Sequence, residues 1–153
     1  MTQNQIRPIA ICVFRHQNRI LVFEAYDHVK NETFYRPLGG AIEFGEHSSI
    51  AVEREIKEEL GTEICNISFL GSIESIFENN GKPGHEIVQV YEADFVNPKY
   101  YQTASLEAFE DDGSELKVIW KEIAFFKNGK APLYPTGLLE LLEKNNSESP
   151  FQK

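Results

Sequence analysis

Residues 39–61, GGAIEFGEHSSIAVEREIKEELG, hold the most informative pattern in the chain. The glycine pair at 39–40 is expected to break regular structure. A helix should follow from about Ser48 to Leu60, with Ser48 or Ser49 as its N-cap. Gly61 is the expected C-terminal stop. The stretch therefore predicts a loop that leads into one helix.

The expected helix has an apolar face and an acidic face side by side. At about 100° per residue, three apolar residues form the core-facing stripe: Val52, Ile56 and Leu60. Three carboxylates share the neighbouring arc of roughly 100°: Glu55, Glu58 and Glu59. Ala51 is the only other residue in that arc, where it should leave space beside the carboxylates. Like charges at these spacings destabilise a helix, so something should compensate them.

Two readings of the acidic arc remain open from composition alone. Hard oxygen ligands clustered in this way suit Mg²⁺ or Mn²⁺ bound to substrate phosphates. A solvated acidic face is the plainer reading, because Arg54 and Lys57 lie next to the arc and could partly neutralise it.

The spacing of the whole stretch resembles the Nudix box, G-x5-E-x7-R-E-U-x-E-E-x-G-U, where U is a bulky aliphatic residue. All seven fixed positions match: Gly40, Glu46, Arg54, Glu55, Glu58, Glu59 and Gly61. Ile56 fits the first aliphatic position, whereas Thr62 departs from the second, which concerns packing after the helix. The resemblance identifies the chain as similar to the Nudix hydrolases.

The resemblance implies a role for each matching residue. Metal ligands would be the carboxylates and one backbone carbonyl: Glu55, Glu58, Glu59 and Gly39. The implied cofactor is Mg²⁺, with Mn²⁺ as a substitute. Glu46 and Arg54 would form a structural pair that ties the loop to the helix. Gly40 and Gly45 would serve loop conformation, and Gly61 is the remaining structural position of the box.

The implied reaction is attack by water on a phosphorus atom of a diphosphate linkage. Glu55 is the first choice for the general base and Glu115 the second. The rivals of Glu115 lie in the acidic run before it: Glu110, Asp111 and Asp112. Arg36 and Tyr35 are the expected substrate contacts, the first for phosphate and the second for stacking. Motifs that mark subfamilies for ADP-ribose, dinucleoside polyphosphates or coenzyme A are absent, so the closest subfamily is not identified.

The remaining pattern predicts one α/β (α+β) domain over residues 1–153, with an ordered core at about 6–143 and a polar tail. Strands are expected at 6–14, 19–26, 34–38, 63–77, 85–96 and 116–123. A loop is expected at 78–84, and mixed secondary structure is expected in the segment 97–114. Thr136 should cap a last helix at 137–143. The order of strands and helices indicates a mixed sheet packed between helices.

Bulk composition narrows the function classes. The net charge of −9 disfavours bulk nucleic acid as a partner. No apolar run is long enough for a membrane span, and no signal segment is evident, so the expected location is cytoplasmic. Cys12 and Cys65 read as structural thiols. A small nucleotide-like diphosphate is the expected partner, while the oligomeric state stays open, with a homodimer as one option.

Two other function classes compete with the hydrolase. The first is a catalytically silent Nudix-fold module that binds a nucleotide or regulates a partner. The intact Glu55, Glu58 and Glu59 argue against it, because modules that abandon catalysis tend to lose these residues. The second is a structural or interaction protein, which leaves the acidic arc unexplained.

Overall fold

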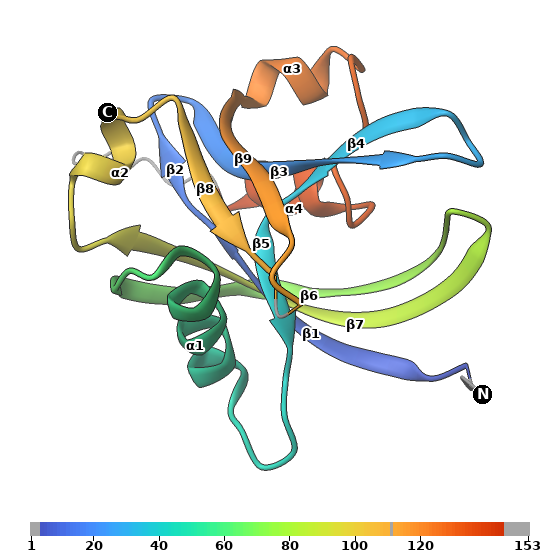
Figure 1. Cartoon of the computed structure of the whole chain (residues 1–153), viewed down its shortest axis with the longest axis horizontal. Coiled ribbons are helices and arrows are strands. Elements are labelled where there is room, and N and C mark those ends of the chain that lie inside the picture. The colour runs from blue at the N-terminus through green and yellow to red at the C-terminus, as the bar shows by residue number, and fades with distance from the viewer. Residues whose placement is uncertain (1–3, 111, 146–153) are drawn as a thin grey trace.

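The structure is a computed structural model that describes residues 4–110 and 112–145. Its strands form two sheets (Figure 1). The first has the order β5 (Leu38–Ala41), β1 (Ile6–Val13), β7 (Lys82–Phe95) and β6 (Ile64–Asn79). The second has the order β2 (Arg15–His16), β3 (Arg19–Asp27), β9 (Glu115–Glu122) and β8 (Ser105–Phe109), and β4 (Glu32–Arg36) pairs with β3. β1 and β7 are parallel and the other neighbours are antiparallel, so the expected mixed α+β class is confirmed.

The helices cover these sheets unevenly. They are α1 (Ser48–Leu60), α2 (Lys99–Gln102), α3 (Ile123–Lys127) and α4 (Leu138–Lys144). α1 contacts β5, β1 and β8, while α4 contacts β6. Figure 1 shows that β5 runs directly into the loop before α1, so strand and helix approach one another from the two ends of this loop. Among the described residues, no helix has the length and apolar character that a bilayer crossing needs.

From Ile9 to Val13, β1 is buried on both of its faces and organises the core. One set of its residues packs with α1: Ala10 and Cys12, followed by Phe14 just after the strand. The alternate set packs with α4: Ile9, Ile11 and Val13. A central strand next to a parallel neighbour reads in this way as a continuous apolar run. Burial raises the pKa of the Cys12 thiol, which fits a structural thiol.

The prediction that the glycine pair at 39–40 interrupts regular structure is wrong. Gly39 and Gly40 lie inside β5 and pair with Ile11 and Ala10 of β1. A Cβ at Gly39, whose φ is +155°, would collide with the backbone of Ala10. These glycines therefore permit close strand approach instead of ending a strand. The break falls at Pro37, which divides the expected strand 34–38 between β4 and β5.

The helix caps differ from expectation at two of three ends. The bounds of α1 and the left-handed C-cap at Gly61 (φ 73°) are confirmed. Its N-cap is His47, with no side-chain cap, because the Ser48 hydroxyl forms a 2.5 Å hydrogen bond with the Tyr91 hydroxyl. Gly137, and not Thr136, is the N-cap of α4.

The expected loop at 78–84 is also wrong. β6 continues to Asn79 and β7 begins at Lys82, so the connection is the two-residue turn Asn80-Gly81. Both turn residues have positive φ, 53° and 81°, which is the geometry of a tight hairpin. α3 was not predicted, and the mixed segment 97–114 contains α2 and β8. The other strand positions are confirmed apart from their ends.

Candidate active site

The expected catalytic helix borders a cleft of about 580 Å³. Its lining includes residues of α1, of β1 and β5, and of the segment where β4 ends. β7 and the loop after β8 each add one glutamate, Glu86 and Glu110. The cleft therefore joins residues that lie between Arg7 and Glu110 in the sequence.

One side of the cleft is the carboxylate wall, which we define as Glu55, Glu58 and Glu59 of α1. Glu55 and Glu59 are buried, and Glu58 is exposed. A Cβ at Gly40 would collide with the carboxyl group of Glu55, so a larger residue where β5 meets the helix would displace that carboxylate. Sequence spacing and structure agree that these three carboxylates share one side of α1.

Arg54 connects this wall to the preceding loop. Its Nε and Nη2 donate to the two carboxylate oxygens of Glu46 at 2.8 and 2.9 Å. Its Nη1 donates to Glu55 at 3.0 Å and to Glu58 at 3.3 Å, and Nη2 also donates to the Ala41 carbonyl at 3.0 Å. A bidentate pair of this kind fixes geometry as well as charge. The structure thus brings Glu46 and Arg54 together in the arrangement that the resemblance implied.

The ion network shifts the titration of its members. Hydrogen bonds from Arg54 and from the Glu43 backbone N–H lower the pKa of Glu46 to about 2. The same Glu46 contact, followed by the contact with Glu55, raises the pKa of Arg54 above its usual range. Arg54 therefore supplies part of the compensation that the clustered helical carboxylates require, through Glu55 and Glu58.

The donor set of the carboxylate wall fits a hard divalent cation. Carboxylate oxygens and a backbone carbonyl at Gly39 are the ligand types that Mg²⁺ and Mn²⁺ prefer, and all four residues line the same cleft. Within residues 4–110 and 112–145, no three His, Cys, Asp or Glu side chains already stand together as a metal site. The guanidinium of Arg54 lies against Glu55 and Glu58.

Two neighbours of the wall lie elsewhere than expected. Ala51 is fully buried in the core with Val52 and Ile56, so it does not leave open space beside the carboxylates. Lys57 forms an ion pair with Glu63 at 2.8 Å. Arg54 alone of the two expected basic neighbours contacts the wall.

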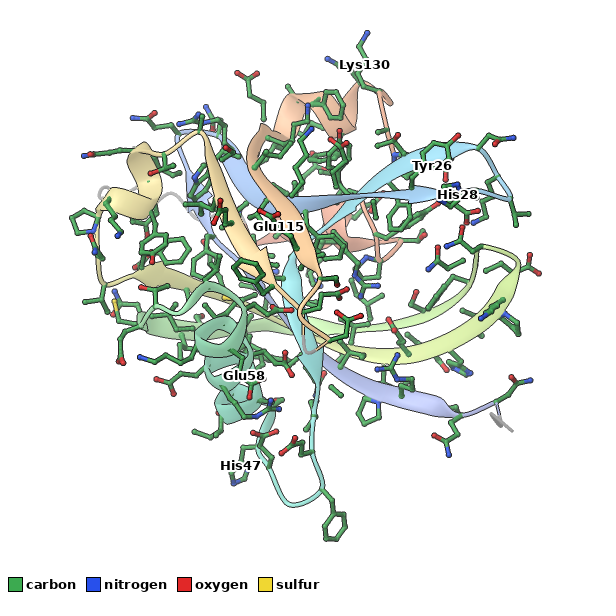
Figure 2. All side chains as sticks on the ribbon, in the orientation of Figure 1. Tyr26, His28, His47, Glu58, Glu115 and Lys130 are labelled. Carbon is green, nitrogen blue, oxygen red and sulfur yellow. The ribbon has the colours of Figure 1, made fainter. Side chains whose placement is uncertain are left out.

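Of the later carboxylates considered for the general base, Glu110 lines the cleft and Glu115 does not. Glu115 is exposed at the start of β9. Figure 2 labels Glu115 on β9 and Glu58 on α1. Asp112 accepts hydrogen bonds from Ser114, which lower its pKa, and Asp111 lies outside the described residues. Glu110 thus replaces Glu115 as the later carboxylate that the cleft can use.

Of the two expected substrate contacts, only one lines the cleft. Arg36 lines the cleft, but Tyr35 lies in the core and does not. The Tyr35 hydroxyl donates to Glu24 at 3.1 Å, and its ring makes an edge contact with Phe125. Adjacent residues of a strand point to opposite faces, so only one of the pair can reach the cleft.

Sequence reasoning missed two charged residues of the lining, Arg7 and Glu86. Glu86 is buried on β7, and its carboxylate lies 3.4 Å from Arg36 and 3.9 Å from Arg7. Arg7 continues the inward face of Ile9 and Ile11 at a period of two, which was a usable signal. Its pairing with Glu86 depends on the register of β1 and β7, which the sequence does not display.

Comparison with known proteins gives one family and several relatives. Residues 5–126 match the family model described as NUDIX domain. The chain is 31% identical over 108 residues to the NAD-capped RNA hydrolase NudC of Vibrio vulnificus, with 71% of this chain and 40% of that protein covered. The chain therefore spans less than half the length of this curated relative.

Solved structures with the same fold include a NUDIX hydrolase from Nitrosomonas europaea. It has a TM-score of 0.62 and 16% identity, with 93% of this chain and 89% of that chain covered. An ADP compounds hydrolase has a TM-score of 0.61 and 16% identity, with coverages of 93% and 74%. At these identities the likeness shows the fold.

Proposed function

Because this chain belongs to the NUDIX domain family, we propose that it is a Nudix hydrolase, which cleaves the diphosphate linkage of a small nucleotide-like substrate with a divalent cation. The observation that carries the proposal is the carboxylate wall. Glu55, Glu58 and Glu59 line a single cleft together with the glycines of β5. We also propose that this chain acts as one Nudix domain.

The cleft has the size and charge that this chemistry needs. Its volume of about 580 Å³ lies within the range of small-molecule sites. A diphosphate is repelled by a wall of carboxylates unless cations stand between them. The acidic wall and an anionic substrate are therefore compatible only when the wall holds metal.

The residues proposed to hold the cation are Glu55, Glu58 and Glu59, with the carbonyl of Gly39. The bound cation supplies positive charge that offsets the charge of the phosphate oxygens. Mg²⁺ is the proposed ion and Mn²⁺ a substitute for it. Loading requires Nη1 of Arg54 to release part of its contact with Glu55 and Glu58, which is consistent with the greater length of the Glu58 contact, 3.3 Å.

The other residues of the site would position these groups and handle the proton. Glu46 holds the guanidinium of Arg54, and Arg54 in turn orients the carboxylate of Glu55. Glu55 is the first candidate to take the proton of the attacking water, and Glu110 is the second because it lines the cleft. Arg36 would bind phosphate oxygens.

We propose a nucleoside diphosphate-linked compound as the substrate class. One relative is named for NAD-capped RNA and one structural neighbour for ADP compounds. NAD and ADP compounds both contain an adenosine diphosphate unit. The net charge of −9 disfavours contact with a long nucleic-acid backbone, so the nucleotide end is the part we expect to be recognised.

One observation favours a second candidate, a nucleotide-binding module without catalysis. Arg54 already neutralises Glu55 and Glu58, and the described part of the chain contains no ready-made metal cluster. If Arg54 never releases these carboxylates, the cleft would bind a nucleotide without cleaving it.

The test is a panel of compounds incubated with Mg²⁺ or Mn²⁺, with the products resolved. The panel holds NAD, ADP-ribose, nucleotide sugars, nucleoside triphosphates, dinucleoside polyphosphates and an NAD-capped RNA. We expect cleavage at a diphosphate linkage that disappears with a chelator and returns when metal is added. Nucleotide binding without cleavage of any compound would support the silent module, and full activity after exhaustive metal removal would exclude the proposed role of the wall.

A further inference from the structure

The strands that line the cleft carry a second charged group, apart from the carboxylates of α1. We call it the strand cluster and define it as Arg7 of β1, Arg36 of β4 and Glu86 of β7. The three residues come from strands that are far apart in the sequence, yet all three line the cleft.

Glu86 is the fixed centre of this cluster. It is only 6% exposed, and each of its oxygens faces one arginine: Oε1 lies 3.4 Å from Nη2 of Arg36, and Oε2 lies 3.9 Å from Nη1 of Arg7. Arg7 and Glu86 are direct neighbours in the β1–β7 register. A buried carboxylate needs such partners, because an unpaired buried charge is strongly unfavourable.

The arginines are not saturated by this contact. A guanidinium has five N–H donors. Within the described part of the chain, Glu86 is the only ion-pair partner of either Arg7 or Arg36. Arg54, the third arginine of the lining, is instead engaged by Glu46, Glu55, Glu58 and the Ala41 carbonyl. Donors for an anionic ligand thus remain in the strand cluster.

The charge of the cluster is opposite to that of the rest of the lining. Two arginines and one glutamate give the strand cluster a net charge of +1. The other charged residues of the lining are Arg54, Glu43, Glu55, Glu58, Glu59 and Glu110, which are acidic in sum. A ligand that carries phosphate is therefore attracted directly only at the strand cluster.

The distance between the two sides suits a chain of phosphates. Ala10 of β1 pairs with Gly40, which abuts Glu55. Arg7 lies three residues before Ala10 on the same strand, which corresponds to about 10 Å at the usual strand rise. Ile9 lines the cleft between these points. Neighbouring phosphates and the reach of an arginine side chain together span this separation.

We propose that Arg7 and Arg36, oriented by Glu86, form an anion subsite for the substrate phosphate remote from the carboxylate wall. The net charge of +1 attracts this phosphate, and the buried carboxylate of Glu86 limits the attraction. The inference rests on the proposed function and assigns Arg7 and Glu86 to substrate binding at the same site.

The experiment measures binding of one non-hydrolysable probe, the α,β-methylene analogue of ADP-ribose, in Mg²⁺ by calorimetry. The parent protein should bind this probe. Arg36→Gln should weaken that binding by about tenfold, and Arg7→Gln, whose side chain is 59% exposed, by about threefold. Arg19→Gln, on β3 and outside the cleft lining, is the matched control and should bind like the parent.

Glu86→Gln tests the subsite through a gain of binding affinity, which a misfolded protein would not show. Loss of the buried negative charge raises the net charge of the cluster from +1 to +2 and should strengthen binding of the probe. The subsite is refuted if both arginine variants bind like the parent, if the parent does not bind the probe, or if Glu86→Gln does not strengthen binding. Intact binding effects without cleavage of any panel compound would refute the hydrolase and leave the subsite standing.

Discussion

The two sides of the cleft are built in opposite ways. Glu55, Glu58 and Glu59 lie within one helix, and a single arginine next to them compensates their charge. The strand cluster is assembled from β1, β4 and β7, and its buried glutamate is compensated by two arginines that are distant in sequence. The position of the carboxylate wall is determined by residue spacing along a single helix. The strand cluster exists only when the sheets have formed in the correct register.

This difference predicts where each side is vulnerable. A change on the carboxylate wall alters a concentrated charge on an element that folds without it, so activity should suffer more than stability. A change in the ion network between loop and helix should affect both, because Arg54 holds the loop and the wall at once.

The largest effect is expected from Glu55→Gln. Glu55 is both a proposed metal ligand and the first candidate for the general base, so turnover should fall at least about a hundredfold. Initial rates on the best substrate of the panel measure it. Glu53→Gln removes the same charge from an exposed position of α1 outside the cleft and should keep full turnover. Equal rates for both variants would remove Glu55 from the chemistry.

The second prediction separates Arg54 from Glu59. Arg54→Ala should lower both activity and melting temperature, since it deletes the bidentate contact with Glu46 and the contact with the Ala41 carbonyl. With the Arg54 side chain 25% exposed, we expect a cost of about 1–2 kcal/mol after allowance for solvent screening. Glu59→Gln should lower turnover at least about tenfold with little loss of stability, because it relieves repulsion between like charges.

Melting temperature and kcat/KM for these two variants decide the roles. An Arg54→Ala protein that melts like the parent but has lost transition-state stabilisation would show that Arg54 binds the substrate directly. A Glu59→Gln protein with unchanged turnover would exclude Glu59 from the ligand set.

The same contrast explains what the sequence could predict. The carboxylates of α1 and the stop at Gly61 were predictable because their positions depend on fixed spacing along one helix. The contact between Arg7 and Glu86 was not, because it depends on the pairing of β1 with β7. Tyr35 was misplaced for a related reason: its neighbour Arg36 reaches the cleft, and strand alternation turns Tyr35 into the core.

The loop that follows β8 also could not be placed correctly from the local sequence. The sequence ranked Glu115 above Glu110, but Glu115 is already part of β9 and pairs with Phe109, while Glu110 lines the cleft. Gly39 and Gly40 were assigned to a break because glycine commonly marks one. Here their missing side chains allow β5 to pack against β1 and Glu55, a contact that no local pattern reveals.

The third prediction tests that loop with a matched pair of variants. Glu110→Gln should reduce turnover by about threefold to tenfold if this carboxylate assists the proton transfer, an effect below that expected for Glu55. Glu115→Gln removes an equal charge close by and should leave turnover unchanged, since Glu115 is not part of the cleft lining. The reverse order of effects would restore Glu115 as the later candidate and would show that the loop rearranges when substrate binds.

The smallest effect concerns pH and the Glu46–Arg54 pair. The folded pKa of Glu46 is lowered from 4.5 to about 2, chiefly by the hydrogen bonds from Arg54. A carboxyl group with a depressed folded pKa stabilises the folded state above its unfolded pKa, and this contribution is lost as pH falls from there to the folded value. The melting temperature should therefore decline between about pH 4.5 and pH 2, and part of this decline should be absent in Glu46→Gln. Glu53→Gln, which removes a charge from the exposed side of α1, should keep the slope of the parent. If Glu46→Gln also keeps that slope, the pair that joins the loop to the carboxylate wall does not form in solution, and the local origin of this side of the cleft would have to be reconsidered.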